Sequence, residues 1–431
     1  MQASERRHAR LADVLLEALW LGTVGFGGGL AVLSMIEQSA LRRGWLTRRE
    51  FTHTAAIAQT LPGSASANCL TYLGLRLFGY RGAALAAGAF VLPSAVLMCA
   101  FAGLYERVHA VPHVAATFRG LAVAVVGLIL SVTVRMGRDG LRRRWQVGVA
   151  ASALLLEQVA HMTVLEVALG GVVAGLLLDT GHRRARLFLR QRSARGRAET
   201  AADEPADDAA DDAADEAADE AADAAAAAED AAEAKGPPPR LSSVVLPALA
   251  AVPLLPVLVT LLLVFARIGA ATFGGGFTMV PFVEQEAVHH YHWLNATEFA
   301  DAVALGQVTP GPVLITATFI GWRVAGLAGA AAATLGIFLV PWLLTVFAGS
   351  WVLRHRNLRS VRSALRGLVP AVVGLMAAAA LSLGETVIDG NTDIAIASGS
   401  FLALYLGDLN PALVIFGGGL LRLAIHHFGG G

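Results

Sequence analysis

Two runs of consecutive glycines lie inside apolar stretches of this chain, with GFGGG at residues 25–29 and TFGGG at residues 272–276. Each glycine weakens a helix by roughly 1 kcal/mol relative to alanine. A glycine run also presents successive backbone N–H groups without a Cβ to block approach. Beside the start of a half-helix, these groups suit a tetrahedral oxyanion. The glycines predicted to bind such an anion are Gly27, Gly28, Gly29, Gly274, Gly275 and Gly276.

The alternative for either glycine run is close packing of helices at small residues, which is common in membranes. Two features favour a break in a helix instead. The run occurs twice at equivalent positions, and a proline–glycine pair follows each copy. A dinucleotide-binding loop is not indicated, because neither run completes G-x-G-x-x-G or follows a strand.

The proline–glycine pairs lie in LPGSASAN, residues 61–68, and TPGPVLIT, residues 309–316. Proline removes a backbone donor and disrupts the turn before it, while glycine opens the backbone. A simple kink is the alternative for either copy alone. A glutamine before each pair could donate to a bound anion or to the broken backbone. The site residues predicted in these segments are Gln59, Pro62, Gly63, Gln307, Pro310, Gly311 and Pro312.

Charged residues recur at equivalent positions in the two copies. Arg76 and Arg323 follow a glycine closely, and an arginine can hold an oxyanion by two parallel hydrogen bonds. The same arginines could instead be anchors that reach to the membrane interface. Glu37 and Glu284 follow the glycine runs and are candidate proton acceptors of a coupled transporter, or interfacial acids.

Other polar residues have simpler interpretations. Glu50 and Glu298 stand three residues after Thr47 and Asn295, as in a capping box at a helix start. Asp301, which has His53 as its counterpart, could place ion coupling in the second copy only or be a drifted interfacial position. The cluster HHYHW is not expected to bind metal, since adjacent histidines in a short loop are a poor ligand set.

Composition sets the class of protein. Hydrophobic residues make up 55% of the 431 residues and charged residues 15%, in long apolar blocks, which predicts an all-α polytopic membrane protein. No Walker loop is visible. The two cysteines, Cys69 and Cys99, lie inside apolar blocks and read as packing residues. We expect apolar segments near 11–36, 52–78, 82–105, 114–136, 145–160, 162–178, 244–283, 299–323, 325–351, 365–384, 392–406 and 409–425.

The chain is a duplication. GFGGGLAVLSMIEQ aligns with TFGGGFTMVPFVEQ at an offset of 247, and WLTRREF, AQTLPGS and FRGLAVAVVGL each have a counterpart. We therefore divide the chain into a first transporter repeat at 1–180, a linker at 181–243 and a second repeat at 244–431. The linker begins basic and then becomes an Ala/Asp/Glu-rich stretch with no apolar face, so we expect it to be disordered and cytoplasmic.

Charge predicts how the copies are oriented. The basic loops are 137–145 in the first copy and 354–366 in the second, which are not equivalent positions. We expect both basic loops to lie in the cytoplasm rather than to bind nucleic acid. Because the two loops occupy non-equivalent positions in the two copies, we expect the copies to form an inverted-topology repeat. The basic N-terminus and basic loop 42–49 would both be cytoplasmic. The segment between them is therefore expected to be a broken or re-entrant helix that turns at its glycines.

Taken together, the F-G-G-G run followed by an acid, W-L-x-x-x-E-F, Q-x-x-P-G-P and G-x-R resemble the chromate ion transporter family. The resemblance covers both copies. It implies a long-chain, two-domain member of the bacterial inner membrane that exports chromate and also handles sulfate, driven by the membrane potential or a proton gradient. It implies no cofactor, no metal and no enzymatic activity, and it is compatible with a homo-oligomer.

The second copy carries the family pattern more fully. Ser34 and Ser64 stand in the first copy where the second has Pro281 and Pro312, so we prefer one site shared between the copies. Three alternatives to a chromate exporter stay open: an importer or exchanger of sulfate or a related oxyanion, a membrane chromate reductase, and a structural or sensory protein. A reductase would need a flavin, haem or paired thiols, for which the chain shows no motif.

Overall fold

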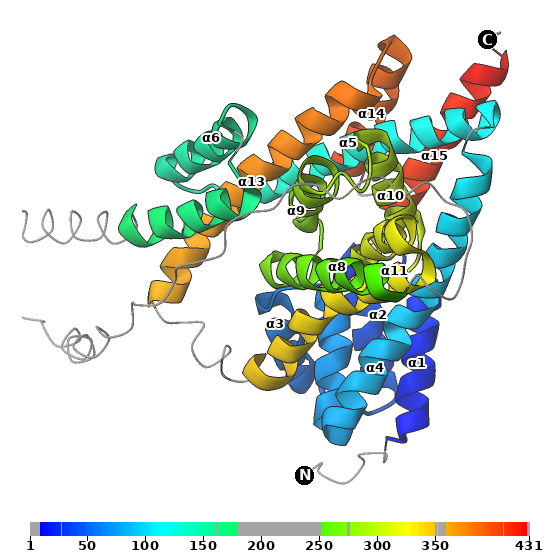
Figure 1. Cartoon of the computed structure of the whole chain (residues 1–431). Coiled ribbons are helices and arrows are strands. Elements are labelled where there is room, and N and C mark those ends of the chain that lie inside the picture. Colours follow the sequence, from blue (N-terminus) through cyan, green and yellow to red (C-terminus); the bar gives the residue numbers. More distant parts are fainter. Residues whose placement is uncertain are drawn as a thin grey trace, which may run out of the picture. The chain divides into compact units, whose positions relative to one another are not determined.

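Every regular element in the described part of the chain is a helix (Figure 1). The computed structural model describes residues 9–26, 28–109, 111–160, 162–178, 251–273, 276–349, 351, 359–407 and 409–428, so the predicted linker at 181–243 lies outside it. The first copy contains α1 (Leu11–Val24), α2 (Gly28–Arg42), α3 (Arg48–Thr60), α4 (Ala65–Val108), α5 (Pro112–Gly140), α6 (Arg144–Gln158) and a helix at Val164–Leu178. The second contains α8 (Ala251–Ala271), α9 (Met279–Glu284), η1 (Gln285–His290), α10 (Ala296–Val308), η2 (Val313–Ile315), α11 (Thr316–Leu343), η3 (Leu344–Ala348), α13 (Arg359–Val387), α14 (Asn391–Tyr405) and α15 (Pro411–Phe428).

Within the described residues, six helical segments are long and apolar enough to cross a membrane. They are Ala65–Val108, Pro112–Gly140, Leu254–Ala271, Val313–Ala348, Ser363–Val387 and Pro411–Phe428. The protein is therefore a multi-pass membrane protein, as its composition predicts. Several remaining helices have only 13 to 15 residues, which is too short to cross about 30 Å of hydrocarbon at 1.5 Å per residue.

Each glycine run ends one helix and precedes another. In the first copy, α1 ends at Val24 and α2 begins at Gly28. The Nη2 atom of Arg43 lies 2.6 Å from a carboxylate oxygen of Glu17, and the Ser39 hydroxyl donates to the same carboxylate. Because the far end of α2 contacts α1, the two helices form a re-entrant hairpin, as the basic flanks predict. We call it hairpin A1.

The second copy repeats this hairpin with different charges. Helix α8 ends at Ala271, the chain turns through Gly276 (φ 99°), and α9 with η1 folds back. Arg267 on α8 forms an ion pair with Glu286 on η1. We call this pair of segments hairpin A2.

The proline–glycine segments form the tips of two further hairpins. Helices α3 and α4 flank residues 61–64, and α10 and α11 flank residues 309–312. The predicted capping boxes at Thr47–Glu50 and Asn295–Glu298 are confirmed. We call these hairpins B1 and B2. Helix α4 bends sharply at Gly79 and α11 at Ala325–Gly326, so a long span follows each B hairpin.

The two copies interlock, and residues 1–178 and 246–431 belong to one compact unit. Helix α6 of the first copy packs on α13 of the second, while α14 and α15 of the second pack on α5 of the first. The Gln146 side chain donates to the Arg366 carbonyl at 3.0 Å, and the Gln158 side chain donates to the Ala378 carbonyl at 3.2 Å. Each copy thus completes the core of the other.

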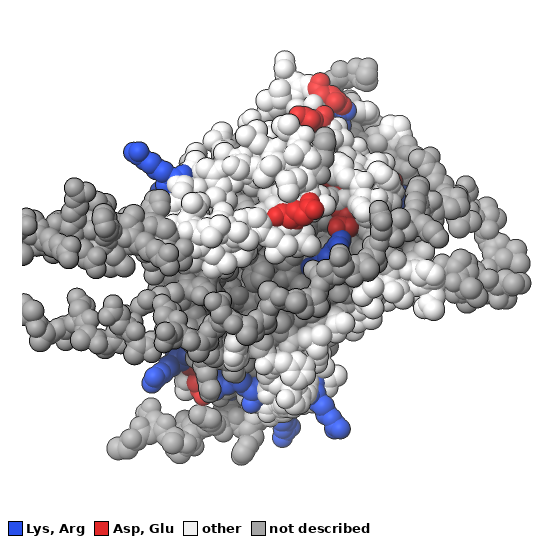
Figure 2. All heavy atoms as spheres, turned by 60° about the vertical axis from the view of Figure 1, so that its left-hand side comes forward, with Lys and Arg blue, Asp and Glu red and all other residues white. Residues whose placement is uncertain are grey.

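Helices α5 and α13 occupy equivalent places in the two copies and run in opposite directions. Arg119, near the start of α5, lies 2.6 Å from Asp389 and 2.7 Å from Asp393, which follow the end of α13. Gln146, beyond the end of α5, contacts Arg366 near the start of α13. This antiparallel pairing agrees with an inverted repeat. Figure 2 shows mainly Lys and Arg at the lower end of the face in view and mainly Asp and Glu toward its upper part.

The inverted repeat predicts opposite accessibility for Arg143 and Asp389. In a background with Cys69 and Cys99 replaced by alanine, Arg143→Cys is expected to react from the cytoplasmic face and Asp389→Cys from the outer face. The reason is that the basic loop at 137–145 is retained in the cytoplasm. Labelling of intact cells with a membrane-impermeant maleimide measures this. Reaction of both cysteines from one face would contradict the inverted arrangement.

Candidate functional site

The tips of the hairpins meet in reciprocal pairs. The backbone N–H of Gly63, at the tip of B1, donates to the Thr272 carbonyl of A2 at 2.6 Å. The backbone N–H of Gly311, at the tip of B2, donates to the Gly25 carbonyl of A1 at 2.9 Å. These four residues are equivalent in the duplication. Each pair therefore combines a proline–glycine tip from one copy with a glycine-run break from the other, and we call the whole arrangement the tip junction.

Glycine is required at the two proline–glycine tips. Gly63 has φ 97° and Gly311 has φ 106°, a region of backbone conformation that side chains rarely allow. A Cβ on Gly63 would lie 2.6 Å from the Pro341 Cβ, and a Cβ on Gly311 would lie 2.0 Å from the Ser94 Oγ. Each tip is thus seated against the long span of the other copy.

The broken backbone at B1 is satisfied by a side chain. The Asn68 Nδ2 donates to the Pro62 carbonyl at 2.8 Å and to the Ala58 carbonyl at 3.3 Å. The hydroxyls of Ser64 and Ser66 lie 2.9 Å apart. The backbone N–H groups of Gly63 and Gly311 donate to carbonyls and are not available to a ligand in this conformation. Polar side chains near the tips are therefore considered as donors alongside the backbone of the glycine runs.

Gln307 is the most informative of these donors. Its side chain is 8% exposed, and its Nε2 has no hydrogen-bond partner among the described residues. A buried donor without a partner costs roughly 1–3 kcal/mol, so a ligand that accepts from it gains accordingly. Its counterpart Gln59 is exposed, so the two copies differ here. Buried polar residues near the tips are Ser64, Ser66, Asn68, Thr272, Thr278, Gln307, Thr309 and Thr316.

Of the six glycines predicted to bind the anion, three lie within the described residues and three lie outside them. Gly28 and Gly29 lie in the first turn of α2, and Gly276 precedes α9. Gly27, Gly274 and Gly275 lie outside the described residues. Pro62, Pro310 and Pro312 stand in the tips beside Gly63 and Gly311, as predicted from the sequence.

Arg76 and Arg323 lie at the bases of the B hairpins rather than at their tips. The Nη2 of Arg76 lies 3.2 Å from the Glu50 carboxylate, and the Nη2 of Arg323 lies 2.9 Å from that of Glu298. Arg323 also contacts Glu106 at 3.2 Å. Eleven residues of helix separate the Arg76 position from the start of α4, or roughly 16 Å. In the structure each arginine therefore forms an ion pair with the capping glutamate at the base of its own hairpin, and we call each pair a clamp.

Reversing one clamp tests this assignment. We expect Arg76→Glu alone to lower transport, because it sets two like charges together at the base of B1. Adding Glu50→Arg should restore at least half of the flux. An arginine that bound the anion itself would not be rescued, since the swapped guanidinium is on another helix. Flux of the single and double variants, compared at equal membrane abundance, decides between the two roles.

The candidate proton acceptors differ in burial. Glu37 on α2 is half-buried, whereas Glu284 at the end of α9 is 3% exposed. The Glu284 Oε1 has no hydrogen-bond partner in the described residues, and the His289 Nε2 lies 4.0 Å from it. The structure does not bring Glu37 and Glu284 to equivalent surroundings.

Some contacts were missed from the sequence. The ion pairs that close hairpins A1 and A2 fall at positions that are not equivalent, so the alignment of the copies gave no signal for them. Asp301 was identified from the sequence as a candidate because its counterpart in the first copy is His53. In the structure it accepts a hydrogen bond from the Tyr105 hydroxyl at 2.8 Å. No cluster of three or more His, Cys, Asp or Glu able to hold a metal occurs in the part of the chain that is described.

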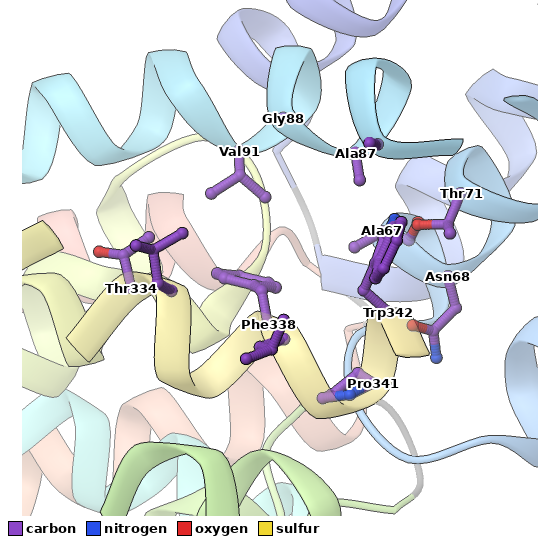
Figure 3. Close-up of a pocket in the computed structure, with 13 residues that line it drawn as sticks. Ala67, Asn68, Thr71, Ala87, Gly88, Val91, Thr334, Phe338, Pro341 and Trp342 are labelled. Atoms are coloured by element: carbon purple, nitrogen blue, oxygen red, sulfur yellow. The ribbon is translucent and has the colours of Figure 1, made fainter. Parts of the chain in front are cut away.

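A groove of about 290 Å³ lies between α4 and α11, beside the B1 tip (Figure 3). Asn68 and Thr71 project from α4, while Thr334, Phe338 and Trp342 project from α11. The Asn68 amide and the two threonine hydroxyls already donate to backbone or hydroxyl partners. The remaining lining is apolar except for the buried Trp342 Nε1, which has no hydrogen-bond partner among the described residues. A single uncommitted donor is too few for a dianion stripped of water.

Comparisons with known proteins agree with the duplication. The sequence profile of the chromate transporter family, described as "Chromate transporter", matches residues 12–176 and again residues 259–423. The chromate transport protein of Cupriavidus metallidurans is 28% identical over 426 residues, covering 97% of this chain and 94% of that protein.

Two further relatives show the same relationship. A probable chromate transport protein of Synechococcus elongatus is 28% identical over 377 residues, covering 85% of this chain and 83% of that protein. The uncharacterized transporter YwrB of Bacillus subtilis is 30% identical over 155 residues, covering 35% of this chain and 78% of that protein. YwrB thus matches about one copy of the repeat. No solved structure matches this chain.

Proposed function

This chain belongs to the chromate transporter family, and on that premise we propose that it exports chromate across the bacterial inner membrane by secondary active transport. The names of the Cupriavidus and Synechococcus relatives support the substrate. The observation that carries the proposal is the tip junction, where four broken helices from both copies meet beside the unpartnered Gln307 amide. Driving force is supplied by the membrane potential or a proton gradient.

The proposed site suits chromate by charge and by hydrogen bonding. Helices α2, α4 and α11 begin at the breaks, so their N-terminal partial positive charges favour an anion. The Gln307 amide supplies a neutral donor that replaces water around the oxygens. The Ser64 and Ser66 hydroxyls bond to each other with one hydrogen, which leaves the second hydrogen of the pair as a further donor. Gly27, Gly274 and Gly275 remain proposed donors, and Arg76 and Arg323 act on binding through the hairpin bases.

The inverted repeat supplies a mechanism for alternating access. The B1 base lies at one end of the fold and the B2 base at the other, each closed by an arginine–glutamate clamp. We infer that opening B1 exposes the tip junction to the cytoplasm and opening B2 exposes it to the outside. Because the copies are related by the duplication, the two open forms are reached by corresponding movements of B1 and B2.

Uptake of labelled chromate into everted membrane vesicles tests the proposal. Energised vesicles containing the protein are expected to accumulate chromate, and an uncoupler should abolish the accumulation. Vesicles from cells that lack the protein are the control. Excess sulfate should compete if tetrahedral dianions share one site, since shape alone separates them poorly. Sulfate flux without chromate flux would move the function to a sulfate or related oxyanion transporter.

A further inference from the structure

A second cavity, distinct from the tip junction, lies where the two copies meet near the start of α10. It has a volume of about 400 Å³, and its walls come from the end of α4, the start of α5, the start of α10 and the end of α13. Asp301 of the second copy lines it together with Tyr105 and His109 of the first. This cavity lies at the base of hairpin B2, since Glu298 of the Arg323 pair also lines it.

Asp301 is buried, and only one of its two carboxylate oxygens has a hydrogen-bond partner among the described residues. Its side chain is 4% exposed, and its Oδ2 accepts the hydrogen bond from the Tyr105 hydroxyl at 2.8 Å. Its Oδ1 is buried and has no hydrogen-bond partner among the described residues. An ionised carboxylate is costly to bury in this state, whereas a neutral carboxyl is far less so. The cavity gives that free oxygen a place to meet water.

The other acids that line the cavity, Glu298 and Asp389, form ion pairs with Arg323 and Arg119. The same two arginines also pair with Glu106 and Asp393, which lie outside the lining. In the described residues no Lys or Arg lies within ion-pair distance of Asp301. The titratable and charged groups on the neighbouring parts of the elements around Asp301 include Tyr105, Glu106, Arg107, His109, His113, Arg119, Glu298, Arg323, Glu385, Asp389, Asp393, Arg422, His426 and His427. Among the acids that line the cavity, Asp301 is thus the one without an arginine partner in the described residues.

The position of Asp301 links this cavity to the tip junction. It lies on α10, the same 13-residue helix that carries Gln307 and ends at the B2 tip. Its bond to Tyr105 also joins the two copies, because Tyr105 belongs to α4. A change of charge at Asp301 therefore acts on both the B2 hairpin and the interface between the copies. The counterpart, His53, is exposed on α3, so this arrangement occurs once in the described chain.

We propose that Asp301 is the proton-binding residue that couples transport to the proton gradient, exchanging its proton with the outer solution through this cavity. The inference rests on the proposed function and names its coupling ion. A proton taken up from the outer solution on the Oδ1 atom neutralises the carboxylate. The same proton leaves that atom toward the cytoplasm when hairpin B1 is open, so one proton crosses the membrane per cycle and no other reactant is needed. Loop charges place the cavity on the outer side, because it lies at the opposite end of α5 and α13 from the basic loops.

Asp301→Asn tests the proposal in proteoliposomes through two separate readouts. Chromate exchange at equal pH on both sides requires no net proton movement, and we expect the variant to retain at least half of the rate of the unaltered protein. Chromate flux driven by an imposed pH gradient should fall at least tenfold in the same variant. Asp389→Asn is the matched control, since Asp389 lines the same cavity but is paired with Arg119, and it should keep gradient-driven flux.

A second variant covers the case in which Asp301→Asn fails to fold. Tyr105→Phe removes the donated hydrogen bond that stabilises the charged carboxylate. We therefore expect the midpoint of the pH profile of gradient-driven flux to move to higher pH, with exchange intact. An unmoved profile in Tyr105→Phe, full gradient-driven flux in Asp301→Asn, or a sodium gradient replacing the pH gradient would overturn the proposal. Absence of both exchange and driven flux in the unaltered protein would instead overturn the proposed function, and the coupling with it.

Discussion

Replacing Gly311 with alanine is expected to lower chromate flux at least tenfold. The residue has φ 106°, and holding a residue with a side chain in such a region costs of order 1–3 kcal/mol. The new Cβ would also lie 2.0 Å from the Ser94 Oγ. Both effects push the B2 tip away from the Gly25 carbonyl and so disrupt the tip junction. Flux in everted vesicles, normalised to the amount of folded protein, measures the loss.

Two companion variants make this result specific. Gly399→Ala on α14 is the control, since a Cβ there meets nothing within 4 Å and should leave flux unchanged. Adding Ser94→Gly to Gly311→Ala removes the steric clash and leaves the backbone strain. Partial recovery in that double variant would show that both causes contribute. Full activity of Gly311→Ala alone would mean that the tip junction is not required for transport.

The second large effect is expected from Gln307→Leu. A hydrogen bond to a charged group is worth about 1.5–3 kcal/mol, so losing it from the Gln307 amide should weaken chromate binding by about 10- to 150-fold. Thermal stability should stay equal or increase, because the substitution removes a buried donor that has no partner. Binding to detergent-solubilised protein and a thermal unfolding curve measure the two quantities on one sample.

The opposite movement of binding and stability separates a ligand contact from a structural one. A Gln307 that only supported the fold would lower stability and affinity together when replaced. Gln59→Leu is the matched comparison in the first copy, where the side chain is exposed, and we expect a smaller loss there. Equal losses at both positions would point to two equivalent sites instead of one shared site.

Local features of this protein were predictable from its sequence. The helix breaks at the glycine runs and proline–glycine pairs are confirmed, as are the capping boxes at Glu50 and Glu298. These features follow from the chemistry of a few adjacent residues: glycine and proline disrupt the helix backbone, and a side chain three residues away satisfies a free N–H group. The duplication, the family and the membrane class likewise follow from patterns in the sequence that can be recognised without knowing any tertiary contact.

Only the tertiary structure decided which groups meet. Gly63 bonds to Thr272, and Tyr105 to Asp301, across roughly two hundred residues of chain. Residue type cannot specify such partners, because any donor at the right depth would fit. For the same reason, the sequence alone suggested that Arg76 and Arg323 bind an oxyanion through their guanidinium groups. In the structure, each hairpin folds back and places its arginine beside a capping glutamate. Residue type determines which interactions a side chain can make. The tertiary fold determines which partner it meets, because the fold decides which helix end lies next to it.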